Sequence, residues 1–411
     1  MRLHKLLLLI FIVLTSKQFS LAQQKYTAWD SLALTPPMGW NSWNFFEGRV
    51  SESVIMDMAD AMVATGMKAA GYQYLIIDDY WVGGRNTQNE LFPDPQRFPH
   101  GIKYLADYIH QKGLKLGIYS DAAPLTCGGV TASLGFEEQD AKTFAAWGID
   151  YLKYDYCNAP EDVATAFTRY STMGNALKKC GRPIVFAICE WGPRKPWLWA
   201  RAAGGHLWRT TWDSRDVWQS NHNGLTGIME IFDQQEALAP YSGPGGWNDP
   251  DLLMVGLYGK GGSSSVNGRF KGCTPTEYRT HFALWCMLDA PLIVNLDLKK
   301  IDNASLQLIT NKQLIQINQD VLGKQALTVY RNNDIQVLQK PLSNNCIAIC
   351  VFNRAATAQK FTLDLKKDLN LWQPLTNANI FSGKIQSKSD LLTDNLASHD
   401  CVVYILSPVR K

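Results

Sequence analysis

The sequence lacks the residue spacings that mark common metal and nucleotide sites. Its nine cysteines include no C-x-x-C pair, and its seven histidines form neither H-x-H nor H-E-x-x-H. Zinc sites are recognised by such spacings, so no metal is expected. No G-x-G-x-x-G follows the first strand-like segment, which argues against a dinucleotide-binding sheet. We therefore predict an activity with no metal and no cofactor.

Long apolar runs are absent after the N-terminal segment. The opening MRLHKLLLLIFIVLTSKQFSLAQQ has a basic start, an apolar run over 6–14 and a small-x-small site at 20–22. This pattern is typical of a secretory signal peptide, which we place at residues 1–22. The run is too short to cross a bilayer, and no later run is long enough. We expect a secreted or periplasmic protein without membrane insertion.

An excess of charge of one sign is absent too. The 40 Lys and Arg residues nearly balance the 37 Asp and Glu residues, leaving a net charge of +3. Nothing here predicts a nucleic-acid partner. The chain is rich in aromatic residues instead, with 14 tryptophans among 411 residues. Tryptophan commonly fills cores, but its flat face also binds sugars, and composition leaves both interpretations open.

Strand-like and helical segments alternate from about residue 36 to residue 320. Ile102, Leu105 and Ile109 recur at helical spacing before Gly113, and a second helix is predicted before Gly148. Counting MGWNSW as the first, eight strand-like units occur, with helices in most gaps. Such alternation requires parallel strands, and eight units are typical of a (β/α)8 TIM barrel. An open, doubly wound sheet is the alternative.

The pattern changes after residue 322. Short runs of alternating polarity are separated by Asn-Asn, Pro and Ser clusters, as in ALTVYRNNDIQVLQKPLSNN. Period-two runs with turns between them predict an antiparallel β-sandwich. We therefore assign residues 23–322 to a catalytic barrel and residues 323–411 to the sandwich. We expect Trp372 of the second domain to be buried, with a carbohydrate-binding role as the alternative.

Acidic residues concentrate at the ends of the predicted barrel strands. Asp78 and Asp79 end one strand, Asp121 another and Asp155 a third. The carboxyl ends of barrel strands share one rim, where such folds build their active sites. A single aspartate in such a place often only caps the next helix. Agreement among several strand ends favours a site.

The segment YLKYDYC predicts a pair of charges in that site. Because strand side chains alternate, Lys153, Asp155 and Cys157 face one way while Tyr154 and Tyr156 face the other. We expect Lys153 to hold Asp155 ionised, as suits a nucleophile. Retaining glycoside hydrolysis needs a second carboxyl about 5–5.5 Å away. WRTTWDSRDVW offers Asp213, directly after a strand, and Asp216, which we place in the following loop or helix start.

Six segments together resemble one family. TPPMGWNSWNFF, YLIIDDYW, YLKYDYC, CEWG, WRTTWDSRDVW and GPGGWNDPDLL occur in order between about residues 34 and 324. They are similar to the melibiase-type α-galactosidases of glycoside hydrolase family 27. The resemblance implies a retaining exo-glycosidase that releases terminal α-linked galactose from oligosaccharides or polysaccharides through a covalent intermediate.

The resemblance also implies roles for single residues. Asp155 would be the nucleophile and Asp213 the acid/base. The galactose-binding positions would be Trp43, Asp78, Asp79, Tyr119, Lys153, Glu190, Trp191, Arg209 and Asp251. A disulfide between Cys127 and Cys157 is implied as well, with two free thiols as the alternative.

Several positions depart from the family pattern. Tyr80 stands where many members have cysteine, and Leu252 replaces a common methionine. Trp212 replaces a small residue before Asp213, and the SRD that follows Asp213 differs from the usual IxD. The assignment of the acid/base therefore rests on the most divergent segment. If the leaving-group subsite differs from that of the family, we expect the difference there.

Other activities and one non-catalytic role stay open. An α-N-acetylgalactosaminidase needs room for an acetamido group, against which the large side chains of CEWG argue. A β-L-arabinopyranosidase differs near O6, where Asp78 and Asp79 favour galactose without excluding arabinose. A non-catalytic galactose-binding protein could keep the fold. Retention of both Asp155 and Asp213 argues against that role.

Overall fold

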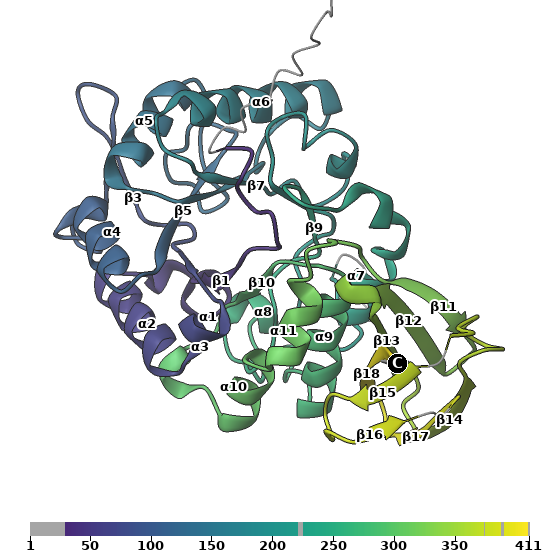
Figure 1. Cartoon of the computed structure of the whole chain (residues 1–411). Coiled ribbons are helices and arrows are strands. Elements are labelled where there is room, and N and C mark those ends of the chain that lie inside the picture. Colours follow the sequence, from purple (N-terminus) through teal and green to yellow (C-terminus); the bar gives the residue numbers. More distant parts are fainter. Residues whose placement is uncertain (1–28, 221–224, 374, 388–389, 410–411) are drawn as a thin grey trace, which may run out of the picture.

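Eight parallel strands form a barrel in the computed structural model, which describes residues 29–409 except 221–224, 374 and 388–389 (Figure 1). The predicted signal peptide at 1–22 lies outside the described residues. Going round the barrel, the strands are β10 (Leu292–Val294), β1 (Met38–Asn41), β2 (Tyr74–Ile76), β5 (Lys115–Asp121), β6 (Tyr151–Asp155), β7 (Val185–Ile188), β8 (Leu207–Arg209) and β9 (Trp247–Asp249).

The barrel closes between the first and last of these strands. Leu253, just after β9, makes a parallel bridge to Val294 of β10, and its backbone N–H donates to the Ile293 carbonyl at 2.8 Å. All eight strand-like units predicted from the sequence are therefore present in one closed sheet, and the predicted TIM barrel is confirmed.

Helices surround the barrel strands (Figure 1). The predicted helix ending near Gly113 is α4, whose Ile102, Leu105 and Ile109 are buried, and α5 ends at Gly148 in the left-handed conformation. No helix of the described segments is both long and apolar enough to span a membrane. The helices are α1 (Trp43–Phe46), α2 (Glu52–Ala64), α3 (Met67–Ala70), α4 (Gly101–Gln111), α5 (Glu137–Trp147), α6 (Val163–Lys179), α7 (Ile228–Asp233), α8 (Gly262–Ser265), α9 (Pro275–Met287), α10 (Asn303–Ile309) and α11 (Lys312–Asn318).

One hairpin was not foreseen from the sequence. Strands β3 (Val82–Arg85) and β4 (Leu91–Pro93) pair antiparallel outside the barrel, between β2 and α4. Arg85 of this hairpin forms an ion pair with the buried Asp140 of α5, at 2.7 Å. This ion pair thus fixes the β3–β4 hairpin to the outer layer of helices.

The C-terminal strands form an antiparallel sandwich, as predicted. A six-stranded sheet runs in the order β11-β12-β13-β18-β15-β16, and β14 pairs with β17 in a second sheet. Apolar side chains such as Val337, Val351, Leu363 and Leu392 fill the core between them. The strands are β11 (Leu327–Arg331), β12 (Ile335–Pro341), β13 (Ile347–Asn353), β14 (Gln359–Asp364), β15 (Leu375–Asn379), β16 (Ile385–Ser387), β17 (Leu391–Leu396) and β18 (Cys401–Pro408).

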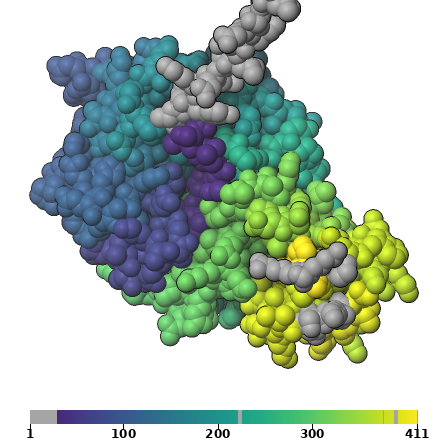
Figure 2. Space-filling view, in the orientation of Figure 1, coloured from purple at the N-terminus to yellow at the C-terminus, as the bar shows by residue number. Residues whose placement is uncertain are grey.

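The C-terminal domain packs against the barrel (Figure 2), through the face of the larger sheet that points away from the sandwich core. Phe352 and Val403 of this face belong to the same apolar core as α9. Lys340 of β12 forms a fully buried ion pair with Asp289, which follows α9. Trp372, in contrast, is 67% exposed, so the expectation that it would be buried was wrong. It lies in the chain between β14 and β15, outside the sandwich core.

Candidate active site

Strand β6 presents its two faces as the alternation predicts. Lys153 and Asp155 line a cavity at the carboxyl end of the barrel. The rings of Tyr154 and Tyr156 instead pack against Tyr170 of α6, with centroids 5.8 and 5.6 Å apart. The sequence therefore separates the functional face of this strand from its packing face.

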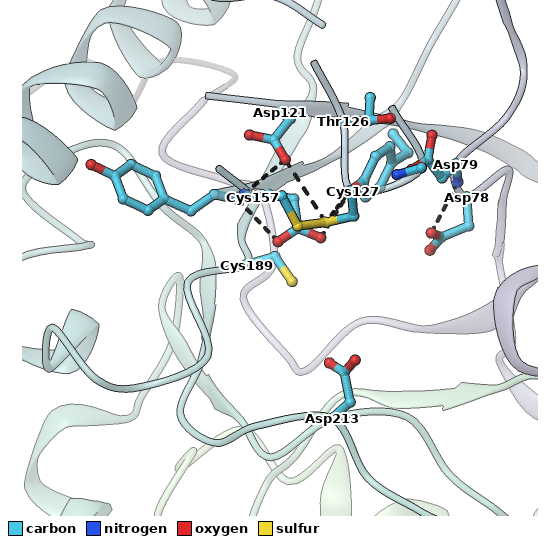
Figure 3. Close-up of a disulfide and its surroundings, with 12 residues drawn as sticks. Asp78, Asp79, Asp121, Thr126, Cys127, Cys157, Cys189 and Asp213 are labelled. Atoms are coloured by element: carbon cyan, nitrogen blue, oxygen red, sulfur yellow. Dashed lines mark hydrogen bonds between the residues drawn. A yellow bond between two sulfur atoms is a disulfide. The ribbon is translucent and has the colours of Figure 1, made fainter. Parts of the chain in front are cut away.

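The cavity collects side chains from strand ends all round the barrel. Ten of the eleven predicted catalytic and binding residues line it, together with Asn44, Cys127, Cys157, Trp212 and Leu252. In Figure 3, Asp213 comes from the side opposite the disulfide and points toward it. The predicted residues in the lining are Trp43, Asp78, Asp79, Tyr119, Lys153, Asp155, Trp191, Arg209, Asp213 and Asp251.

Glu190 is the predicted binding residue that the cavity lining lacks. Its side chain is fully buried, and its Oε1 accepts the backbone N–H of Arg194 at 2.7 Å. The backbone of the next residue, Trp191, has a positive φ of 65°. Trp191 reaches the cavity while Glu190 stays buried outside its lining, and the contact of Glu190 with the sugar stays a prediction.

Lys153 forms its ion pair with Asp78 and not with Asp155. Its Nζ lies 2.8 Å from Oδ2 of Asp78, and Asn41 Nδ2 donates to the same oxygen at 2.7 Å. Asp155 accepts a hydrogen bond from the Tyr119 hydroxyl at 3.0 Å. Lys153 therefore acts on Asp155 through space, while its hydrogen bond fixes Asp78.

Burial dominates the electrostatics of Asp155. Loss of hydration raises its pKa to about 6, against the charge of Lys153, which lowers it. The charge of Asp213 raises the pKa of Asp155 further. The two carboxyl groups therefore titrate as an interacting pair, and any measured pKa belongs to both.

Arg209 sets the charge state of the second carboxyl group. Its Nη2 lies 3.0 Å from Asp213 Oδ1, and its Nη1 lies 3.0 Å from Asp251 Oδ1. Partial burial would raise the pKa of Asp213, but Arg209 and then Arg215 outweigh it and lower that pKa. Asp213 is thus an ionised group held at the cavity wall by a forked guanidinium.

Asp216, the other carboxyl of the same segment, has a structural place. It is buried away from the cavity and accepts hydrogen bonds from the backbone of Gly259 and Cys273 and from the Tyr278 hydroxyl. It therefore ties the loop after β8 to the region before α9. The preference for Asp213 over Asp216 as a cavity residue agrees with this arrangement.

A disulfide between Cys127 and Cys157 closes a 30-residue separation in the cavity wall (Figure 3). Cys157 N–H donates to Asp121 Oδ2 at 3.0 Å. Asp121, Cys127, Asp155 and Cys157 have ligand atoms within 4.8 Å of one another. Both sulfurs are bonded to each other, so this group offers a metal no thiolate ligand.

Asp121 was named from the sequence only as a strand-end carboxyl and Trp212 only as a departure from the family pattern, and neither was given a catalytic or binding role. Asp121 shares a strand face with the predicted Tyr119, two residues earlier, so alternation carried a signal for it. Burial, and then the charge of Asp155, raise the pKa of Asp121 to about 9. Trp212 carried no such signal, because it lies after the end of β8.

A TIM barrel whose cavity, at the carboxyl ends of its strands, is lined by several carboxyl groups fits a glycoside hydrolase. The family model described as alpha galactosidase A matches residues 35–320, and that of the alpha galactosidase C-terminal beta sandwich domain matches residues 332–406. The chain belongs to the α-galactosidase, or melibiase, family.

Individual relatives agree with this assignment. The chain is 42% identical to alpha-galactosidase A of Cellvibrio japonicus, covering 98% of this chain and 99% of the relative. It is 43% identical to an alpha-galactosidase of Cyamopsis tetragonoloba over 94% and 89% of the two chains. Alpha-galactosidase I from Mortierella vinacea superposes with a TM-score of 0.85 at 35% identity, covering 92% of this chain and 98% of that one.

Proposed function

We propose that the protein is an exported, retaining exo-α-galactosidase that releases terminal α-linked galactose from oligosaccharides or polysaccharides. One observation carries the proposal: Asp155 from β6 and Asp213 from the loop after β8 line the same cavity. Relatives that match nearly the whole chain bear the name alpha-galactosidase, which supports the substrate. Export rests on the signal-like sequence at residues 1–22.

The reaction proceeds in two displacements. In the first, a carboxylate oxygen of Asp155 bonds to the anomeric carbon while Asp213 gives its proton to the departing glycosidic oxygen. In the second, Asp213 takes a proton from water, the water oxygen bonds to the anomeric carbon, and the bond to Asp155 breaks. Two inversions leave galactose in its original α configuration.

Charged and aromatic groups around the cavity would orient the sugar. Asp78 and Asp79 present carboxylates to the O4 and O6 hydroxyl groups, and the Trp43 ring covers the apolar face of galactose. Asp78 is held by Lys153, and Asp79 accepts the Gly128 backbone N–H at 2.7 Å. Because these partners fix the carboxylates beforehand, an epimer would leave buried hydrogen-bonding groups unpaired.

Asp213 must gain a proton before it can act as the acid, and the charge of Arg209 opposes this by lowering the pKa of Asp213. Arg209 also reaches Asp251, so it has a second anion to hold. When the sugar's O2 and O3 hydroxyl groups engage Arg209, its attraction for Asp213 weakens. The proton required at the glycosidic oxygen would then be more stable on Asp213, which couples sugar binding to the acid role.

The nucleophile is tested with Asp155→Asn. The activity of this variant on p-nitrophenyl α-galactoside should be at least about a thousandfold lower than that of the wild type, because the covalent intermediate cannot form. Asp107→Asn is the matched control, since Asp107 is an exposed partner of Lys103 on α4. Substantial turnover by Asp155→Asn, with the fold intact by circular dichroism, would remove Asp155 from the mechanism.

Stereochemistry and substrate range test the rest of the proposal. Proton NMR of the first product should show α-galactose before mutarotation, whereas β-galactose would exclude retention. Hydrolysis should be faster for the α-galactoside than for the matching α-N-acetylgalactosaminide or β-L-arabinopyranoside. Binding of galactose with no turnover of any of these would favour a non-catalytic role. Expression in a bacterium with N-terminal sequencing should give Gln23 as the first residue.

A further inference from the structure

Trp212 is an exposed tryptophan on a rigid part of the active-site rim. Its side chain is 52% exposed and lines the cavity. Its neighbours Thr211 and Ser214 are buried, so the segment itself is not a surface loop. A large apolar ring left in water beside a charged cavity gains nothing from burial, and core packing does not explain it.

Hydrogen bonds fix the residues that directly follow Trp212 in the chain. The backbone N–H and the hydroxyl of Ser214 donate to Asp251 Oδ2 at 2.8 and 3.0 Å. The Thr226 hydroxyl donates to the Asp213 carbonyl at 2.5 Å. The position of the Trp212 ring is therefore set before any ligand arrives, which reduces the entropy lost on binding.

A second tryptophan supports the ring of Trp212. The rings of Trp191 and Trp212 stack with centroids 5.3 Å apart and planes 18° from parallel. Trp191 is held by its turn, with φ of 65°, followed by Gly192 with φ of 97°. An ordinary side chain adopts that backbone only when its surroundings fix it. Two loops, after β7 and after β8, thus build one aromatic wall.

The position of this wall relates it to the leaving group. Asp213, the residue after Trp212, is the proposed acid, whose proton goes to the glycosidic oxygen. That oxygen joins galactose to the leaving group. Side chains that lie next to Asp213, on the solvent side of the cavity, therefore face the leaving group. Flat aromatic surfaces bind the apolar C–H face of pyranose rings. We propose that Trp212, backed by Trp191, is a leaving-group subsite that stacks on the sugar next to the terminal galactose.

This inference rests on the proposed function, and a comparison of two substrates separates them. Melibiose has a glucose leaving group that can reach Trp212, whereas α-galactosyl fluoride has a single leaving atom that cannot. Trp212→Ala should lower kcat/KM for melibiose about tenfold and leave that for α-galactosyl fluoride within about twofold. Trp212→Phe keeps a flat ring and should retain most of the melibiose activity.

The control removes a tryptophan of similar exposure elsewhere. Trp372→Ala deletes the exposed ring of the C-terminal domain and should change neither substrate. Equal losses on both substrates in Trp212→Ala would mean that the ring supports the galactose-binding part of the cavity, and no loss on either would mean that it does not bind the leaving group. Either result overturns the inference. A displaced Asp213 would lower melibiose turnover alone, and the partition experiment below distinguishes that case, because attack by water and attack by glucose both need Asp213 as the base. Failure of the wild-type enzyme on α-galactosyl fluoride would instead refute the proposed function.

A partition experiment measures the same subsite from the opposite direction. The galactosyl enzyme formed from α-galactosyl fluoride reacts either with water or with an added sugar bound in the leaving-group subsite. With glucose as acceptor, Trp212→Ala should lower the ratio of disaccharide to free galactose several-fold, since water needs no ring to bind. An unchanged ratio would contradict the subsite even if the melibiose rate fell.

Discussion

Lys153 Nζ lies 2.8 Å from Asp78 Oδ2, although Lys153 is in β6 and Asp78 follows β2, on the other side of β5. The ammonium group passes over the ring of Tyr119 on that middle strand, 5.2 Å from its centroid. Both charged side chains are largely buried. Each charge therefore offsets the cost of burying the other, and the pair fixes one wall of the cavity.

Lys153→Met should destabilise the protein and shift its pH profile. Removing one partner of a buried pair typically costs about 3–5 kcal/mol, which urea unfolding would detect. The pKa of Asp155 should rise further, because Lys153 lowers it. The acid limb of kcat/KM should then move to higher pH.

The exposed pair Lys103–Asp107 provides the control for that substitution. Lys103→Met should change the free energy of unfolding by only about 0–1 kcal/mol. Adding Asp78→Asn to Lys153→Met should recover part of the lost stability, since no unpaired charge is then buried. If Lys153→Met is as stable as Lys103→Met, the pair is not the constraint described here.

Asp213→Asn should lower the pKa of Asp155. The negative charge of Asp213 raises that pKa, so its removal makes ionisation of Asp155 easier. Release of fluoride from α-galactosyl fluoride needs Asp155 ionised but needs no proton from Asp213. The acid limb of its pre-steady-state rate, near pH 6 in the wild type, should move to lower pH. Asp213→Glu retains the negative charge and should leave the acid limb at the same pH as in the wild type. Acid limbs at the same pH in both variants would contradict the effect of the Asp213 charge on the pKa of Asp155.

Much of this fold was accessible from sequence because each barrel strand carries its own signal. An apolar run ending in polar residues identified β2, β5 and β6 as strands with functional ends. The β3–β4 hairpin carried no such signal, since its short strands have little apolar pattern and only β3 is glycine-rich. Local pattern predicts an element best where that element faces the core.

Side-chain partners were less accessible than strand faces. Alternation placed Lys153 in the cavity, but its choice of Asp78 over Asp155 depends on the curvature of the barrel. Glu190 lies outside the cavity lining, and the next residue, Trp191, has a positive φ of 65°. Both features concern geometry between elements or at a strained turn, which no local pattern encodes.

Loss of the disulfide should weaken both stability and activity. Replacing Cys127 and Cys157 by serine opens a loop of about 30 residues, which costs about 3–4 kcal/mol in the chain-entropy treatment. Both cysteines line the cavity, and Cys157 N–H is bonded to Asp121, so turnover should fall as well. Thiol reductant should reproduce the effect in the wild type. Cys180→Ser, at a half-buried free thiol, is the control and should unfold like the wild type with or without reductant.

The buried Lys340–Asp289 pair should stabilise the contact between the two domains. Lys340→Met would leave the Asp289 carboxylate without its counter-charge, at a cost of about 3–5 kcal/mol. Burial raises the pKa of Asp289 to about 7 even with Lys340 present. Calorimetry should therefore show that Lys340→Met unfolds at a lower temperature than the wild type. This decrease in unfolding temperature should be smaller at pH 5 than at pH 8. Lys366→Met removes an exposed pair with Asp390 and should shift the transition little.

Asp121→Asn should become relatively more stable as pH rises. The folded pKa of Asp121, about 9, exceeds the unfolded value of about 3.9, so folding favours the protonated form. The stability that this carboxyl contributes is complete below about pH 4 and is lost as pH rises toward 9. An asparagine can accept the Cys157 N–H in the same way and does not ionise.

The free energy of unfolding of Asp121→Asn, relative to that of the wild type, should therefore increase between pH 4.5 and pH 8. Urea unfolding at both pH values measures this difference. Asp107→Asn, which changes an exposed carboxyl, should track the wild type within about 0.5 kcal/mol at both pH values. A constant difference between Asp121→Asn and the wild type would mean that Asp121 is ionised in the folded protein. The carboxylate of Asp155 would then have a second negative charge beside it, and its own acid limb would have to lie well above pH 6.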